Sequence, residues 1–150
     1  MNYKKRKPNL SKHSARIAAI QAMYQCEITG ENINEILNNF KIHYIEVDEI
    51  HKDINMSFFN KLISHFSKNT DLTVIIEENL DESSVFSSLP LICRCILKVA
   101  LLEMKFEKTD IPVVINEYVD ISKYFLNEKT TSFVNAILDK ISKNIERTNT

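Results

Sequence analysis

Glycine and proline are scarce in this chain of 150 residues. Glycine occurs once, at Gly30, and proline three times, at Pro8, Pro90 and Pro112. Folds built from strands need turn residues about every ten positions, and these two residue types supply many of them. Their scarcity therefore predicts an all-α fold made of long helices.

The hydrophobic content of 44% in 150 residues is enough to build the core of one compact domain. Apolar residues recur at helical spacing along most of the chain, and we expect a compact bundle of about seven helices over residues 11–150. Short helices expected around residues 69–88 divide it into two packed helical subdomains, an N-terminal half of about 11–80 and a C-terminal half of about 81–146.

Capping signals predict where the helices begin and end. Ser11 is a plausible cap for a first helix that runs to about Ile28, with Gly30 as its stop. Asn32 and Glu35 have the spacing of a capping box for a second helix. The remaining helices are expected at about Asp48–Lys68, over Leu72–Ile76, in a brief turn opened by Asp81–Ser84, at Leu89–Phe106, from Pro112 to Phe125 and at about Thr130–Glu146. The helix at Leu89–Phe106 is apolar all round and should be central.

The first 26 residues carry no acidic residue, although the whole chain has 19 Lys and Arg against 20 Asp and Glu. The basic residues of this segment are Lys4, Lys5, Arg6, Lys7, Lys12 and Arg16. Residues 1–10 contain no periodic apolar pattern and are expected to form a flexible basic arm. A basic terminus on an acidic body is typical of binding to nucleic acid, and a tail that only improves solubility is the alternative.

Catalytic and metal-binding patterns are not found in the sequence. It has no Gly-rich phosphate loop, no G-x-S-x-G elbow and no Cys beside a His, so we expect no enzyme and no cofactor. The four histidines are scattered and predict no metal site. Cys26, Cys93 and Cys95 are odd in number and lie in apolar helical runs, as buried thiols of a reducing cytoplasm do. No signal peptide and no apolar run of about 18 residues is present, so no membrane contact is expected.

Two aromatic residues lie near basic ones, a combination that suits single-stranded nucleic acid because cations hold the phosphates and rings stack on the bases. Tyr24 lies two helical turns beyond Arg16, and its alternative role is to pack its ring in the core. Phe133 lies about 100° from the centre of the apolar stripe of its helix. It is either the margin of the core or a partly exposed stacking surface.

Several segments resemble successive signatures of the NusB family of transcription antitermination proteins. They are residues 15–24 (ARIAAIQAMY), 96–100 (ILKVA) with Glu103, 110–112 (DIP), 114–117 (VINE) and 133–140 (FVNAILDK). The similarity covers about Lys12 to Ile141 in the order and spacing of the family. It implies an all-helical fold of two packed subdomains, no enzyme activity and no cofactor.

The resemblance also implies partners and site residues. Members pair with the ribosomal protein NusE, hold boxA-type single-stranded RNA and act in an RNA polymerase antitermination complex that supports ribosomal RNA transcription. The family's basic head matches Lys12 and Arg16, with His13 where an arginine is common. Its first-helix tyrosine matches Tyr24, and its F-V-N-G aromatic matches Phe133.

This chain departs from the family pattern at four positions. Ala136 replaces the glycine of F-V-N-G, Leu126 replaces a usual glycine before the last helix, and Cys93 replaces a common glutamate. Lys129 stands where an acidic residue is common, and a lysine near Phe133 favours contact with an RNA phosphate. We therefore add Lys129 to the expected RNA-binding residues.

Two other functions remain open at this point. The same fold could be a protein-interaction module without RNA binding of its own, such as the regulatory domain found on ribosomal RNA cytosine methyltransferases. It could also be a helical scaffold that binds only protein. The free protein could be a monomer or a homodimer, since helix edges with aromatic residues suit both.

Overall fold

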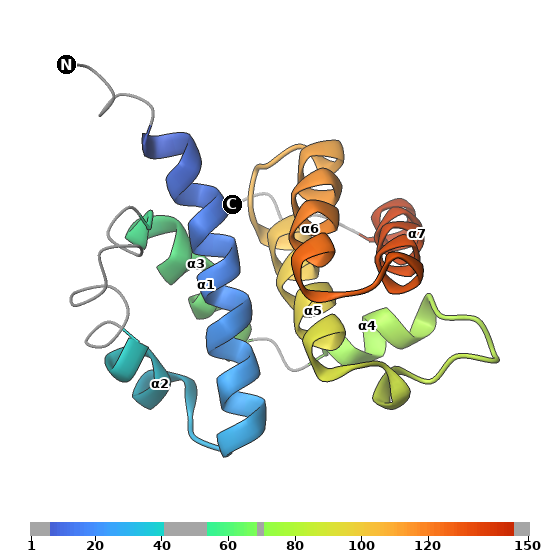
Figure 1. Cartoon of the computed structure of the whole chain (residues 1–150), viewed down its shortest axis with the longest axis horizontal. Helices are drawn as coiled ribbons and strands as arrows, with labels where there is room; N and C mark the ends of the chain where they lie inside the picture. The colour runs from blue at the N-terminus through green and yellow to red at the C-terminus, as the bar shows by residue number, and fades with distance from the viewer. Residues whose placement is uncertain (1–6, 41–53, 69–70, 146–150) are drawn as a thin grey trace. The chain divides into compact units, whose positions relative to one another are not determined.

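The computed structural model describes residues 7–40, 54–68 and 71–145, and every regular element in these ranges is helical. The α-helices are α1 (Lys7–Thr29), α2 (Ile33–Phe40), α3 (Met56–Lys68), α4 (Leu72–Glu78), α5 (Leu91–Phe106), α6 (Ile111–Phe125) and α7 (Glu128–Asn144), with a 3₁₀ turn η4 (Phe86–Ser88) before α5. The predicted all-α class and the number of helices are confirmed (Figure 1).

The chain forms two compact units, Met1–Ser67 and Lys68–Thr150. The boundary lies earlier than the one expected near residue 80, because α4 packs against α5 in the second unit. Two side-chain contacts add to this attachment: the Lys105 ammonium lies 3.9 Å from the Asp71 carboxylate, and the Asn144 amide donates to the side-chain oxygen of Asn79 at 2.9 Å.

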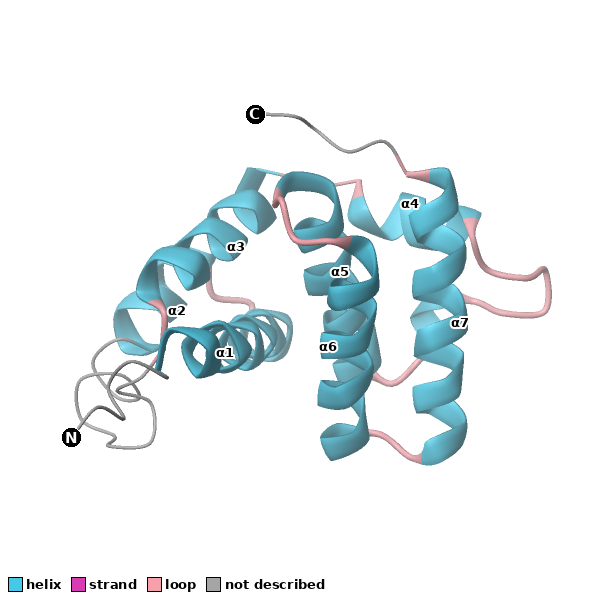
Figure 2. Cartoon of the chain, turned by 90° about the horizontal axis from the view of Figure 1, so that it is seen from above, coloured by secondary structure: helices cyan, strands magenta, loops and turns pink. Residues whose placement is uncertain are grey.

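In the first unit, α1 packs against α2 (Figure 2). The side chain of Phe58 in α3 contacts Lys12 and Arg16 of α1. Small side chains let neighbouring backbones come close. The buried apolar residues of α1 are mostly small: Ala15, Ala18, Ala19, Ala22, Ile20 and Met23. From α2 and α3 the core receives Ile36, Phe59, Leu62 and Ile63.

The first helix begins earlier than predicted. It starts at Lys7, so Ser11 lies inside it and residues 7–10 belong to a helix rather than to a flexible arm. Pro8 suits this position, because the first turn of a helix leaves its backbone N–H groups unpaired and a proline has none to leave. The end was predicted correctly: Gly30 adopts a φ of 75° and its N–H donates to the carbonyl of Cys26 at 2.9 Å. Residues 1–6 lie outside the described part.

Asparagine side chains cap three of the helices. Asn32 caps α2 as its spacing predicted, since the Glu35 N–H donates to Asn32 Oδ1 at 3.0 Å. The Glu35 carboxylate accepts from the Asn32 side-chain amide at 3.3 Å, whereas in a full capping box it accepts from the backbone N–H. The predicted start of the third helix at Asp48 is wrong, because residues 54–55 are not helical and the Phe58 N–H donates to Asn55 Oδ1 at 3.0 Å. Asn127 likewise caps α7, which begins at Glu128, two residues before the expected start at Thr130.

In the second unit, α5 is the central helix, as predicted: it packs against α4, α6 and α7, and ten of its residues are buried. Helices α6 and α7 lie side by side and are joined through Leu126 and Asn127 (Figure 2). The expected brief helix after Asp81 is a turn, closed by the Ser84 N–H on the Asp81 carbonyl, and η4 follows it. Among the described residues, no helix is both long and apolar enough to cross a bilayer.

Candidate nucleic-acid interface

The basic side of α1 rests on an aromatic ring of α3. Lys12 and Arg16 are one helical turn apart and therefore share a face of α1. The Lys12 Nζ lies 5.3 Å, and the Arg16 guanidinium carbon 5.2 Å, from the centre of the Phe58 ring. These distances are within the range of cation–π attraction. One ring thus holds two cations of the expected RNA-binding set.

The two cations differ in exposure. Lys12 is exposed, whereas Arg16 retains only 3% of its accessible surface. The sequence suggested that Arg16 would be a surface cation, but the structure places it in the interior, where a guanidinium keeps its charge and needs compensating contacts. The contact of its guanidinium with the Phe58 ring is one of these. In this conformation Lys12 can reach a phosphate and Arg16 cannot.

The other predicted residues of the first unit have varied positions. Tyr24 is 38% exposed, so part of its ring is accessible for stacking. His13 is half-buried. Lys7 opens α1, but its side chain, like Lys4, Lys5 and Arg6, lies outside the described residues.

In the second unit, Lys129 and Phe133 share one flank of α7, because they are four residues apart. Lys129 is exposed and Phe133 is half-buried. This intermediate exposure is the one expected for an aromatic at the margin of the apolar stripe. Lys129 and Phe133 belong to the second unit, whereas Lys12, Arg16 and Tyr24 belong to the first.

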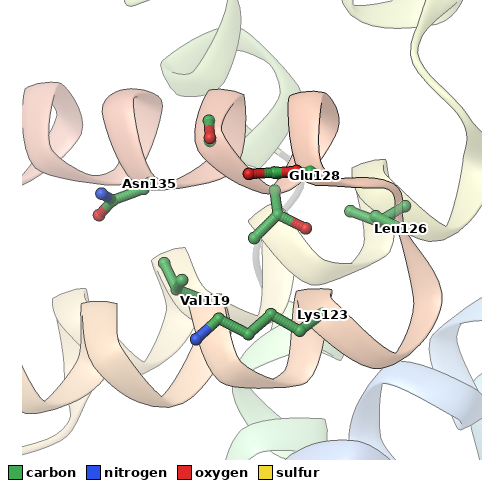
Figure 3. A pocket seen from close by; sticks show the side chains of 7 residues that line it. Val119, Lys123, Leu126, Glu128 and Asn135 are labelled. Atoms are coloured by element: carbon green, nitrogen blue, oxygen red, sulfur yellow. The ribbon is translucent and has the colours of Figure 1, made fainter.

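A groove of about 450 Å³ runs between α6 and α7 (Figure 3). Its lining residues are Val119 and Lys123 of α6, Leu126 of the connection, and Glu128, Thr131, Ser132 and Asn135 of α7. Successive residues of a helix point about 100° apart, so Phe133 is turned away from the flank that Ser132 lines. The groove is therefore a different surface of α7 from the one with Lys129 and Phe133.

The groove offers mixed polarity and no catalytic arrangement. The Lys123 ammonium lies 3.4 Å from the Asp120 carboxylate, and the buried Thr131 hydroxyl has no hydrogen-bond partner in the described structure. In residues 7–40, 54–68 and 71–145, His, Cys, Asp and Glu side chains do not gather in groups of three that could hold a metal ion.

The three cysteines form no disulfide bond, and two of them, Cys93 and Cys95, are buried as predicted. Cys26 is only half-buried, which corrects the expectation for that residue. Burial raises the pKa of the Cys93 thiol to about 11, with the Arg94 charge opposing the shift. Burial also raises the pKa of Cys26, helped by the carboxylates of Glu27 and Glu31. A raised pKa disfavours the thiolate, so none of this indicates a nucleophile.

Positions where the sequence departs from the family pattern have separate structural roles. Cys93 is buried in α5, so it contributes to the core and not to a surface. Leu126 lines the α6–α7 groove, and Ala136 is exposed on α7. The sequence did not indicate Phe58 as a site residue, because its spacing with Leu62 and Phe66 predicts only a place on the apolar face of a helix. Its contact with two cations depends on the packing of α3 on α1, which apolar spacing alone does not reveal.

The sequence and the structure both match known proteins. The model of the NusB family matches residues 13–143. Transcription antitermination protein NusB of Sinorhizobium fredii is 35% identical over 138 residues, which cover 88% of this chain and 86% of that protein. The protein of the same name from Bradyrhizobium diazoefficiens is 33% identical over 136 residues, 87% of this chain and 82% of its own length.

Two solved structures have the same fold. T. maritima NusB is 28% identical, with a TM-score of 0.68, and the match covers 88% of this chain and 90% of that one. In the crystal structure of the antitermination factors NusB and NusE in complex with dsRNA, one chain matches with a TM-score of 0.70 at 24% identity, covering 90% of this chain and 98% of its own length.

Proposed function

Since this chain belongs to the NusB family, we propose that it is a transcription antitermination factor that binds boxA-type single-stranded RNA together with the ribosomal protein NusE. In this role it joins an RNA polymerase antitermination complex and supports transcription of ribosomal RNA. The observation that carries the proposal is the family match over residues 13–143, which includes most of the described residues of both units.

The proposed RNA contacts use cations for phosphates and rings for bases. Cations that neutralise phosphates release counterions and give affinity without sequence preference. We assign this role to Lys4, Lys5, Arg6, Lys7, Lys12, His13 and Lys129, while the buried Arg16 adds its positive charge to the same RNA-binding set without touching a phosphate. Stacking on aromatic side chains adds contacts to the bases, and we assign it to Tyr24 and Phe133, whose rings are both partly accessible.

The proposed role is non-catalytic and cytoplasmic, and it needs no cofactor or metal ion. Binding and positioning of RNA and protein require only a charged surface with accessible rings. Both features are found on α1 and α7.

The test is RNA binding of the full chain, measured by fluorescence anisotropy across a range of salt concentrations, with and without NusE. Replacing Lys4, Lys5, Arg6 and Lys7 by Gln should weaken binding and flatten the log–log salt slope by about 0.7 for each lost phosphate contact on a single strand. The control variant replaces four exposed lysines of other segments by Gln: Lys61, Lys108, Lys140 and Lys143. It should keep most of the slope.

A second arm tests stacking. Phe133→Ala should weaken RNA binding about tenfold, since a stacked base contributes on the order of 1–3 kcal/mol. Phe125→Ala, which removes a ring of α6 that is 40% exposed, is the matched control and should bind as the wild type does. If the wild type binds NusE but no RNA, the chain is a protein-interaction module and the proposed RNA role is wrong.

A further inference from the structure

The ring of Phe58 is almost completely enclosed, yet it lies beside an exposed cation. Phe58 is 5% exposed, and the Arg16 guanidinium in contact with it is 3% exposed. Lys12, on the same ring, is exposed to solvent. The three side chains therefore form one contact group in which Phe58 and Arg16 are buried and Lys12 is exposed.

The ring offsets a repulsion that α1 would otherwise carry by itself. Like charges four residues apart on a helix destabilise it. The negative face of an aromatic ring attracts a cation electrostatically, and the attraction is stronger where water is excluded. Both Lys12 and Arg16 lie near enough to Phe58 to gain from this attraction. The ring thus allows two positive charges to be kept close together.

The contact also restricts the Lys12 side chain. A free lysine side chain samples many rotamers and loses that freedom when it binds a phosphate. A lysine whose ammonium already lies 5.3 Å from a buried ring has part of this freedom removed before RNA arrives. The Arg16 guanidinium lies 5.2 Å from the centre of the same ring, and a buried charge is screened by salt much less than an exposed one.

We infer that Phe58 is a positioning residue for an RNA phosphate: it holds Lys12 at the surface in a binding-ready position, with the charge of Arg16 held on the same ring. The inference rests on the proposed RNA binding. It assigns the direct phosphate contact to Lys12, and Arg16 acts through its electric field. Phe58 touches no RNA.

A double-mutant cycle in the full chain tests this inference, with boxA-type RNA and NusE as the ligands. Phe58→Leu keeps an apolar side chain and both cations but removes the ring. It should weaken RNA binding about three- to fivefold, and the salt slope should not change because no charge is lost. Lys12→Gln should weaken binding and reduce the slope by about 0.7. In the Lys12→Gln background, Phe58→Leu should have almost no further effect on affinity.

Two further measurements separate positioning from loss of folding. Phe66→Leu removes another aromatic ring of α3, one that is half-buried, and serves as the matched control with unchanged RNA affinity. The ring-current shift of the Lys12 side-chain protons, measured by NMR in the wild type, reports the contact without any substitution. The absence of this shift would overturn the inference, whatever the variants do.

The outcomes also separate this inference from the proposed function. If the wild type binds RNA but Phe58→Leu binds equally well, or if the two substitutions act independently, the positioning role is wrong and the proposed function stands. If the wild type binds no RNA with or without NusE, both are wrong.

Discussion

Among the described residues, each unit buries one side chain of the Asp, Glu, Lys and Arg types, and the two are accommodated differently. In the first unit, Arg16 lies against the face of Phe58, a contact that continues to the exposed Lys12. In the second, Glu103 is fully buried in α5 and accepts a hydrogen bond of 2.8 Å from the Tyr118 hydroxyl of α6. A ring face attracts cations over a broad area, whereas a hydrogen bond is directional. The contact of Phe58 with two cations thus suits binding at a surface. The hydrogen bond from Tyr118 to Glu103 suits stabilisation of the folded second unit.

The largest effect expected from this comparison is on the second unit. Tyr118→Phe removes the hydroxyl that donates to Glu103 and should reduce the free energy of unfolding by about 1–2 kcal/mol, because a buried acceptor loses a partner. Urea denaturation followed by circular dichroism measures this loss. Tyr124→Phe is the control on the same helix, since Tyr124 is 76% exposed. Equal unfolding midpoints for the two variants would remove the stability role from the Glu103–Tyr118 contact.

The second prediction compares the caps of α3 and α7. Asn55→Ala and Asn127→Ala each remove a side-chain acceptor from a helix start and should each cost about 1 kcal/mol of stability. Only Asn55→Ala should also loosen the ring contact of Lys12, because the N–H that Asn55 accepts from belongs to Phe58. Lys12 ring-current shifts measured on both variants check this. A loss of the shift in Asn127→Ala would show that the contact depends on the second unit as well.

The smallest effect concerns the thiols and appears only in alkaline solution. An unfolded cysteine has a pKa of about 8.5–9, and the folded value for Cys93 is raised to about 11. Below the unfolded pKa the thiol is protonated in both states. As the pH rises from about 9 to about 11, the unfolded state releases its proton more readily, so stability falls.

Thermal melting at several pH values checks this prediction. Cys93→Ala should melt with a shallower decline between about pH 9 and 11 than the wild type does. Cys26, which is only half-buried, should react with iodoacetamide before Cys93 does. An unchanged pH profile in Cys93→Ala would show that other groups cause the decline.

Helix content could be predicted from the sequence because apolar spacing and the scarcity of glycine both reflect local rules. Gly30 and the Asn32 cap were predicted from single residues whose conformational preferences are strong. The start of α3 could not be predicted in this way. In the sequence, Ile50 and Ile54 precede Phe58 and Leu62 at the same spacing of four residues, so the apolar pattern begins before the helix does. Ile54 is indeed buried, but it lies before the helix and not in it. The same apolar spacing is therefore found in buried residues inside the helix and in a buried residue before it. Only the capping side chain of Asn55 shows where the helix begins.

The candidate site could be predicted only in part, for a related reason. Charge and helical spacing placed Lys12 at the surface and Phe133 at the margin of a core, since both properties depend on one helix. The burial of Arg16 depends on a ring from a different helix, and no spacing within α1 carries that information. The spacing of residues within one helix does not show contacts between residues that are far apart in the sequence.

The amide link between Asn79 and Asn144 has a consequence for synthesis on the ribosome. It joins residues 65 positions apart, at the ends of α4 and α7. Asn79 also donates to the Ile75 carbonyl at 2.9 Å, so one side chain closes α4 and fastens it to α7. Because translation proceeds from the N-terminus, the Asn79 side chain must wait for its partner until 65 further residues have been made. The second unit can form this link only after α7 has been synthesised, while the residues of the first unit are available much sooner.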